Sequence, residues 1–106
     1  MSRSDVELVG DALDHIEVLK RHLNRGDLAD ETVADAVSLR LAAAIEAVAA
    51  TTVEFRNETF GDEWKLIWAT RNRIAHGYAY IDLTLIRNTI EQDLPEFEQQ
   101  LRRSFQ

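Results

Sequence analysis

His76 is the side chain in this sequence best placed for acid–base chemistry. It ends a helical pattern and stands directly before Gly77, a natural stop for a helix. The helix C-terminus favours the charged imidazole, whereas nearby Arg71 and Arg73 oppose it. Opposed influences of this kind suit a general acid or base. The alternative is a histidine that only caps the helix or faces solvent.

Arg71 carries a charge on a face where the sequence predicts burial. On a helical wheel at about 100° per residue, the apolar residues of this segment share one face, and Arg71 falls in its middle. The structural alternatives are a guanidinium that reaches solvent or one that pairs with an acid such as Glu46. The apolar residues of the face are Trp64, Ile67, Trp68, Ile74 and Ala75.

Arg71 and His76 do not share a face of one straight helix. Five residues turn an ideal helix by about 140°, whereas Asn72 lies four residues before His76 and shares its face. Either the helix unwinds before Gly77 and swings His76 round, or two copies of the helix build one site across a symmetry axis. We favour the second arrangement, because an alanine-rich surface is available for pairing.

Four amphipathic segments must position these residues. The sequence has one proline and four glycines, a composition that predicts long uninterrupted helices. Apolar residues recur at three- and four-residue steps in residues 4–24, 30–56, 64–76 and from 82 onward. The last segment contains Pro95, where we expect either a kink or the start of a fifth helix.

The ends of these helices have recognisable sequence patterns. Ser4 with Glu7 predicts a capping box, and Gly26 predicts a left-handed cap at the end of the first helix. Residues 57–61 are expected to connect the second and third helices. Asp93 before Pro95 is typical of a helix start.

These segments predict an all-α fold, an up-and-down bundle of four to five helices in a single domain over residues 1–106. The stretch 41–50 is rich in small residues, which suit tight packing inside the bundle or against a second copy. We therefore expect a dimer. No strand-like alternation and no His/Cys spacing for a metal are present, so no cofactor is expected.

The composition limits the function and the location. There are no cysteines and no apolar run long enough for a membrane span, so we expect a cytoplasmic protein that does not bind membranes. The net charge of -7 argues against broad contact with nucleic acid. However, residues 1–60 hold 6 basic and 12 acidic residues, whereas residues 61–106 hold 6 and 7. The acidic first segment contains His15 and His22, which we interpret as ordinary solvated residues.

The run from Arg71 to Tyr78, Arg-Asn-Arg-Ile-Ala-His-Gly-Tyr, resembles the Arg-x(4)-His-x-Tyr motif of the HepT-like toxins of the HEPN superfamily. Residues 40–47 are similar to the second-helix signature of that family, and residues 64–67 to its Trp-x-x-Ile lead-in. Residues 82–101 are similar to its C-terminal helix region. The resemblance covers about residues 33–101, with the first helix agreeing in pattern only.

The resemblance implies a toxin of a toxin–antitoxin pair that acts as a metal-independent endoribonuclease. Arg71 would bind the scissile phosphate of the RNA, and His76 would be the general base or acid. Both would line a composite cleft at the interface of a homodimer. Asn72 and Arg73 would support RNA binding.

The resemblance also implies a partner. Tyr78 matches the family tyrosine to which an MntA-like nucleotidyltransferase antitoxin attaches AMP, with assembly into a dimer or a higher oligomer with that antitoxin. AMP would add bulk and negative charge beside the cleft and so block RNA. The alternatives are a non-catalytic HEPN scaffold or substrate-binding partner of a nucleotidyltransferase, and a plain structural dimer.

Overall fold

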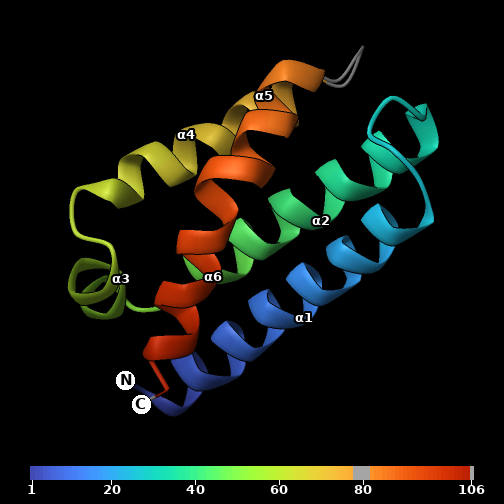
Figure 1. Cartoon of the computed structure of the whole chain (residues 1–106). Helices are drawn as coiled ribbons and strands as arrows, with labels where there is room; N and C mark the ends of the chain where they lie inside the picture. The colour runs from blue at the N-terminus through green and yellow to red at the C-terminus, as the bar shows by residue number, and fades with distance from the viewer. Residues whose placement is uncertain (78–81, 106) are drawn as a thin grey trace.

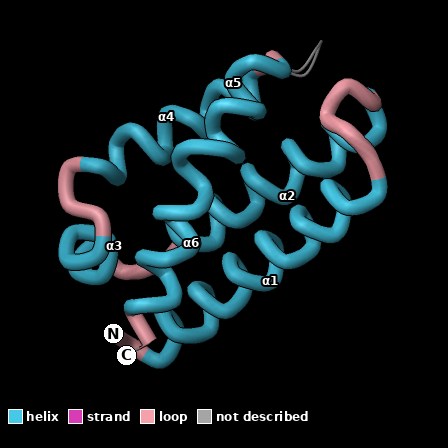
Figure 2. The backbone as a smooth tube through the Cα atoms, in the orientation of Figure 1, coloured by secondary structure: helices cyan, strands magenta, loops and turns pink. Residues whose placement is uncertain are grey.

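The computed structural model describes residues 1–77 and 82–105, and this part of the chain contains helices and loops but no strand (Figure 2). The last three helices follow one another without a loop and form one continuous rod. The elements are α1 (Arg3–Arg25), α2 (Glu31–Ala49), α3 (Val53–Thr59), α4 (Glu63–His76), α5 (Leu83–Asn88), the π-helix η1 (Thr89–Asp93) and α6 (Leu94–Arg103).

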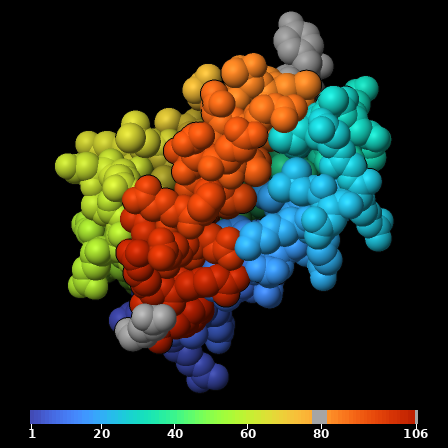
Figure 3. Space-filling view, in the orientation of Figure 1, coloured from blue at the N-terminus to red at the C-terminus, as the bar shows by residue number. Residues whose placement is uncertain are grey.

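The described elements form the up-and-down bundle that the sequence predicts, with the short α3 in addition. α1 and α2 lie side by side and antiparallel, and α4 packs on α2 (Figure 1). The rod formed by α5, η1 and α6 returns across the front of the molecule, and α6 also contacts α1 (Figure 3). α4 is therefore held against the bundle by α2. The start of α1 and the end of α6 lie close together (Figure 1).

The core lies between these layers. α1, α2 and α6 each bury apolar side chains at helical spacing, as amphipathic helices do. No single helix in the described ranges is long and apolar enough to cross a membrane, although the bent pair α2–α3 passes the same test on length and composition. The largest apolar side chains with almost no exposure are Ile16, Leu19, Leu41, Ile86 and Leu101.

Both predicted ends of the first helix are wrong in detail. The capping box is formed by Ser2 and Asp5, not by Ser4 and Glu7, so the helix begins earlier. Gly26 is extended, with φ -179° and ψ 174°, and is not a left-handed cap. Its lack of a side chain serves close packing, because a Cβ there would lie 3.0 Å from a methyl group of Val33.

The predicted single helix over residues 30–56 is in fact two helices that meet at a bend of 114°. Asp5 of α1 holds the chain at this break, because its carboxylate accepts hydrogen bonds from both the backbone N–H and the hydroxyl of Thr52, each at 2.8 Å. Thr52 in turn caps α3. Burial raises the pKa of the Asp5 carboxyl, but these hydrogen bonds and those from Ser2 outweigh it and hold the pKa below its ordinary value.

Residues 57–61 were expected to be a connection, but residues 57–59 still belong to α3. The chain then turns at Gly61, the one described residue with a positive φ, 56°. This left-handed conformation favours glycine. Its N–H donates to the carbonyl of Asn57 at 3.1 Å, and α4 starts two residues later.

The two alternatives for Pro95 are resolved by a π-turn. Leu94 donates its N–H to the carbonyl of Thr89, five residues back, and α6 starts there with Pro95 in its first turn. A proline ring in a regular α-helix clashes with the carbonyl four residues earlier. The wider π-turn makes room for this ring, so the rod continues without a loop.

Candidate functional site

α4 stays helical through His76, which tests whether the helix unwinds before Gly77. Gly77 follows with φ -98° and ψ 28°, and its N–H donates to the carbonyl of Ile74 at 3.2 Å. The helix therefore does not unwind before Gly77, and that alternative is wrong. Arg71 and His76 remain about 140° apart around α4.

Arg71 is clamped by three neighbours. Its Nε and Nη2 donate to Oε1 of Glu46 on α2, at 2.8 and 2.6 Å, and its Nη1 donates to the Asn72 side chain at 3.2 Å. The guanidinium also lies over the ring of Trp68, 4.8 Å from the ring centroid. The pairing of Arg71 with Glu46 that the sequence suggested is thus confirmed, and the ring fixes the plane of the guanidinium.

The clamp does not use all of the guanidinium. Arginine carries five N–H groups, and three of them donate to Glu46 and Asn72 in the described part of the chain, which leaves two for an incoming anion. The Arg71 side chain is 26% exposed and that of Glu46 is 49% exposed. The charge is therefore oriented but still accessible from solvent.

The other predicted site residues lie around the end of α4. Asn72 is half-buried and touches Arg71, whereas Arg73 and His76 are exposed. The structure thus brings Asn72 to Arg71 and leaves His76 on another side of the helix. Tyr78 lies outside the described residues. No cluster of three or more His, Asp or Glu side chains in the described ranges is placed to hold a metal ion.

The predicted buried face of α4 is only partly covered. Ile74 is buried at 8% exposure, but Trp64, Ile67, Trp68 and Ala75 are half-buried. The two tryptophan rings stack with centroids 6.2 Å apart. A half-covered aromatic edge thus runs along α4 to the guanidinium of Arg71.

The alanine-rich stretch of α2 has two faces, as the sequence predicted. Ala44 is fully buried in the core, whereas Ala43 and Ala47 are half-buried. Leu39, one turn before Ala43, is 68% exposed. Leu39, Ala43 and Ala47 lie at four-residue steps, so they share the face of α2 that leads to Glu46.

His15 is not the ordinary solvated residue that we expected. It is half-buried between α1 and α2, and its Nδ1 lies 3.0 Å from Nη1 of Arg40. A guanidinium only donates, so Nδ1 of His15 is the acceptor in this contact. No local pattern in the sequence indicates this contact, because the two residues belong to different helices.

The described part of the chain is a helical bundle, and α4 presents an oriented Arg71 with His76 five residues later. These features define a helical protein of the Arg-x(4)-His class. A family model described as ribonuclease HepT-like matches residues 9–104, and the chain therefore belongs to the HepT-like family. The resemblance seen in residues 33–101 is confirmed and extends into α1. No curated protein and no solved structure matches the sequence.

Among the described residues, Trp68 has a role at the site that the sequence did not predict. It was assigned to the buried face, but it also supports the Arg71 guanidinium. The spacing of Trp68 and Arg71 could have predicted this contact. Residues three apart on a helix are neighbours, and an arginine favours the face of a tryptophan ring.

Proposed function

We propose that this chain is a metal-independent endoribonuclease and the toxin of a toxin–antitoxin pair. The observation that carries the proposal is the Arg71 guanidinium, which Trp68 and Glu46 orient and which keeps two N–H groups for an anion. Preorganised donors of this kind stabilise the charge that develops on a phosphate in the transition state. Membership of the HepT-like ribonuclease family supports RNA as the substrate.

In the proposed reaction, the 2′-hydroxyl of the RNA attacks the adjacent phosphate and the 5′-oxygen leaves. Arg71 binds the phosphate, and His76 acts as general base for the attack or as general acid for the leaving oxygen. Asn72 holds the guanidinium, and exposed Arg73 adds positive charge for RNA binding. The products are a 2′,3′-cyclic phosphate and a 5′-hydroxyl.

We propose that two copies of the chain form the working site. Arg71 and His76 point about 140° apart in one chain, so one phosphate is better reached by Arg71 of one copy and His76 of the other. The half-buried aromatic edge of α4 and the face of α2 with Leu39, Ala43 and Ala47 are surfaces that a second copy would cover.

Mixing two inactive variants tests this composite site. Arg71→Ala chains and His76→Ala chains are unfolded together, refolded together and assayed on RNA. If each site takes its arginine and histidine from different copies, half of the dimers are mixed and each holds one intact site. About a quarter of the wild-type activity should then return. Sites contained within one chain would give no recovery.

Growth of cells that express the chain tests the toxin function. Wild type should arrest growth and degrade RNA, whereas Arg71→Ala and His76→Ala should be harmless. Arg40→Lys, which changes an arginine outside the motif, is the matched control and should remain toxic. If wild type, Arg71→Ala and His76→Ala are all equally harmless in the absence of an antitoxin, the ribonuclease function is rejected in favour of the scaffold.

We also propose that an MntA-like nucleotidyltransferase antitoxin attaches AMP to Tyr78 and so prevents RNA binding. Mass spectrometry after co-expression with such an enzyme should find the added AMP on Tyr78. The chain offers Tyr80 as a matched control, so Tyr78→Phe should abolish the modification and Tyr80→Phe should not. Modification at Tyr80 alone, or none, would contradict the proposal.

The second candidate function is a non-catalytic HEPN scaffold that binds a nucleotidyltransferase. One observation favours it, namely that the Glu46 carboxylate already neutralises the Arg71 charge at 2.6 Å. In a scaffold this pair would only join α2 to α4. RNA cleavage by the purified chain separates the two functions, because only the ribonuclease needs the remaining donors of Arg71.

A further inference from the structure

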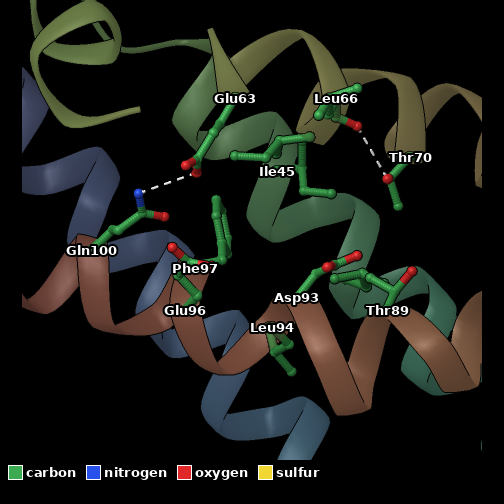
Figure 4. A pocket seen from close by; sticks show the side chains of 12 residues that line it. Ile45, Glu63, Leu66, Thr70, Thr89, Asp93, Leu94, Glu96, Phe97 and Gln100 are labelled. Atoms are coloured by element: carbon green, nitrogen blue, oxygen red, sulfur yellow. Dashed lines mark hydrogen bonds between the residues drawn. The ribbon is translucent and has the colours of Figure 1, made fainter. Parts of the chain in front are cut away.

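A groove of about 370 Å³ lies on the flank of α4 away from Arg71, between α4 and the rod of η1 and α6 (Figure 4). Its floor is apolar and buried, with exposures of 2–6%, and comes from α2 and α6. Leu66 of α4 forms part of the rim and is 72% exposed. The floor residues are Leu41, Ile45, Leu94 and Phe97.

The rim of the groove is acidic. Glu63, Asp93 and Glu96 line it and are exposed, and the described lining residues include no Lys, Arg or His. None of the three carboxylates makes an ion pair among the described residues. Glu63 accepts one long hydrogen bond from Gln100, at 3.4 Å, which closes one end of the groove (Figure 4).

The π-turn helps to shape the other end of the groove. Thr89 and Asp93, its first and last residues, both line the groove, and Thr89 faces Thr70 of α4 across that end (Figure 4). The Thr89 hydroxyl is satisfied by the carbonyl of Leu85 at 2.8 Å. π-turns inside α-helices occur frequently at functional sites.

We propose that this groove binds an amphipathic helical segment of a partner protein, with apolar side chains over Phe97 and Leu66 and with Lys or Arg side chains against Glu63, Asp93 and Glu96. The groove follows α4 over residues 63–70 and the rod over residues 89–100, roughly 10–16 Å at 1.5 Å per residue. This length accommodates two to three turns of a helix. Binding of an apolar helix face in a groove is a common mode of recognition.

Charge selects this occupant over two others. Three unpaired carboxylates repel the phosphates of RNA, and they also disfavour a second copy of a chain whose net charge is -7. A basic segment is attracted by the same groups. Arg71 does not line the groove, and Leu66 on its rim lies about 140° around α4 from Arg71, so we expect the occupant to leave the guanidinium accessible. The proposal therefore stands independently of ribonuclease activity.

Binding of a designed probe peptide tests the proposal. The probe is a fluorescein-labelled helical peptide of about 14 residues, long enough to fill the groove, with leucines at three- and four-residue steps and lysines elsewhere. A second peptide has glutamates in place of the lysines. Anisotropy measures affinity for the full chain, and amide chemical shifts locate the bound peptide.

Variants distinguish the groove from general attraction to an acidic protein. Leu66→Ser should weaken binding of the lysine peptide about tenfold, and Glu63→Gln with Glu96→Gln should weaken it about three- to thirtyfold. Glu7→Gln with Glu31→Gln removes the same charge from the N-terminal helices and should leave binding within about twofold. All positions are exposed, and thermal melting checks that each variant is folded.

The expected result is a preference for the lysine peptide, shifts at Leu66, Thr70 and Thr89, and weaker binding only in the groove variants. Equal weakening in the control variant would overturn the proposal, because attraction would then be diffuse. Equal binding of the glutamate peptide would overturn it too. Shifts elsewhere, or self-association of the chain through this face in sedimentation, would also reject it.

Discussion

Replacing Arg71 by lysine separates the charge of this residue from its geometry. Lysine keeps the positive charge but loses the planar guanidinium that donates to Glu46 through two nitrogens and lies 4.8 Å from the Trp68 centroid. If Arg71 is a preorganised phosphate ligand, Arg71→Lys should impair catalysis far more than it impairs folding.

The cost to stability follows from the contacts. A cation–π contact at a partly exposed site contributes about 0.5–1 kcal/mol, and an exposed ion pair about 0–1 kcal/mol, part of which lysine retains. The free energy of unfolding should therefore fall by about 1 kcal/mol. A domain of this kind has about 5–15 kcal/mol to lose, so well over nine chains in ten remain folded.

The cost to catalysis should be larger. Loss of one oriented donor to a transition-state oxyanion reduces kcat about 100- to 1,000-fold, and we expect the lower value because lysine keeps the charge. Initial rates of cleavage of a short labelled RNA measure this loss, and urea unfolding of the same samples measures stability. Arg40→Lys is the control, because Arg40 also bridges two helices through a guanidinium but lies outside the motif.

A loss of less than about threefold in Arg71→Lys would refute the role of Arg71 as a preorganised ligand, since a loss that small would mean that charge alone suffices. That role would equally be refuted if Arg40→Lys lost as much activity at the same stability. Either result would leave the pairing with Glu46 as a structural contact, as the scaffold alternative requires.

Three further predictions concern the fold that positions α4. The pKa of the Asp5 carboxyl is lower in the folded state than its ordinary value of 3.8. Between the folded and the unfolded pKa, the unfolded chain therefore binds more protons than the folded chain. The stability that Asp5 contributes is complete above pH 3.8 and is lost as the pH falls through the folded pKa. Urea midpoints measured from about pH 5 to pH 2 should show this loss, and Asp5→Asn should flatten it. Ser38 has a buried hydroxyl with no partner in the described residues, so Ser38→Ala should raise the free energy of unfolding by about 1 kcal/mol, seen as a higher Tm; a lower Tm would mean that the hydroxyl is satisfied. Gly61→Ala forces a side chain onto a positive φ and should lower stability by about 1–2 kcal/mol in urea unfolding, whereas no change would show that the turn relaxes.

The helices, including α4 with the candidate site, were predictable because their apolar pattern depends on residues that are close in the sequence. Burial on one face repeats every three to four residues, so the pattern located α1, α2 and α4 and placed Arg71 on a face with Trp68. Glu46 was named only as one example of an acid that could pair with Arg71, and it is the packing of α2 against α4 that brings the two together.

The remaining features depend on contacts between distant residues, which a local pattern does not contain. The bend between α2 and α3 is held by Asp5, which lies 47 residues before its partner Thr52 in the sequence. The contact of His15 with Arg40 joins two helices in the same way. Pro95 predicted an interruption of the regular α-helix in the last segment. Whether that interruption is a kink, a new helix or a π-turn depends on packing against the rest of the bundle.

The most direct test of the central claim is the chemistry of RNA ends produced by the purified chain in the presence of EDTA. The proposal predicts cleavage that leaves 2′,3′-cyclic phosphate and 5′-hydroxyl ends, fails when the attacking 2′-hydroxyl is replaced by hydrogen, and is lost in both Arg71→Ala and His76→Ala. Cleavage that leaves 5′-phosphate ends, or that persists in either variant, would contradict it.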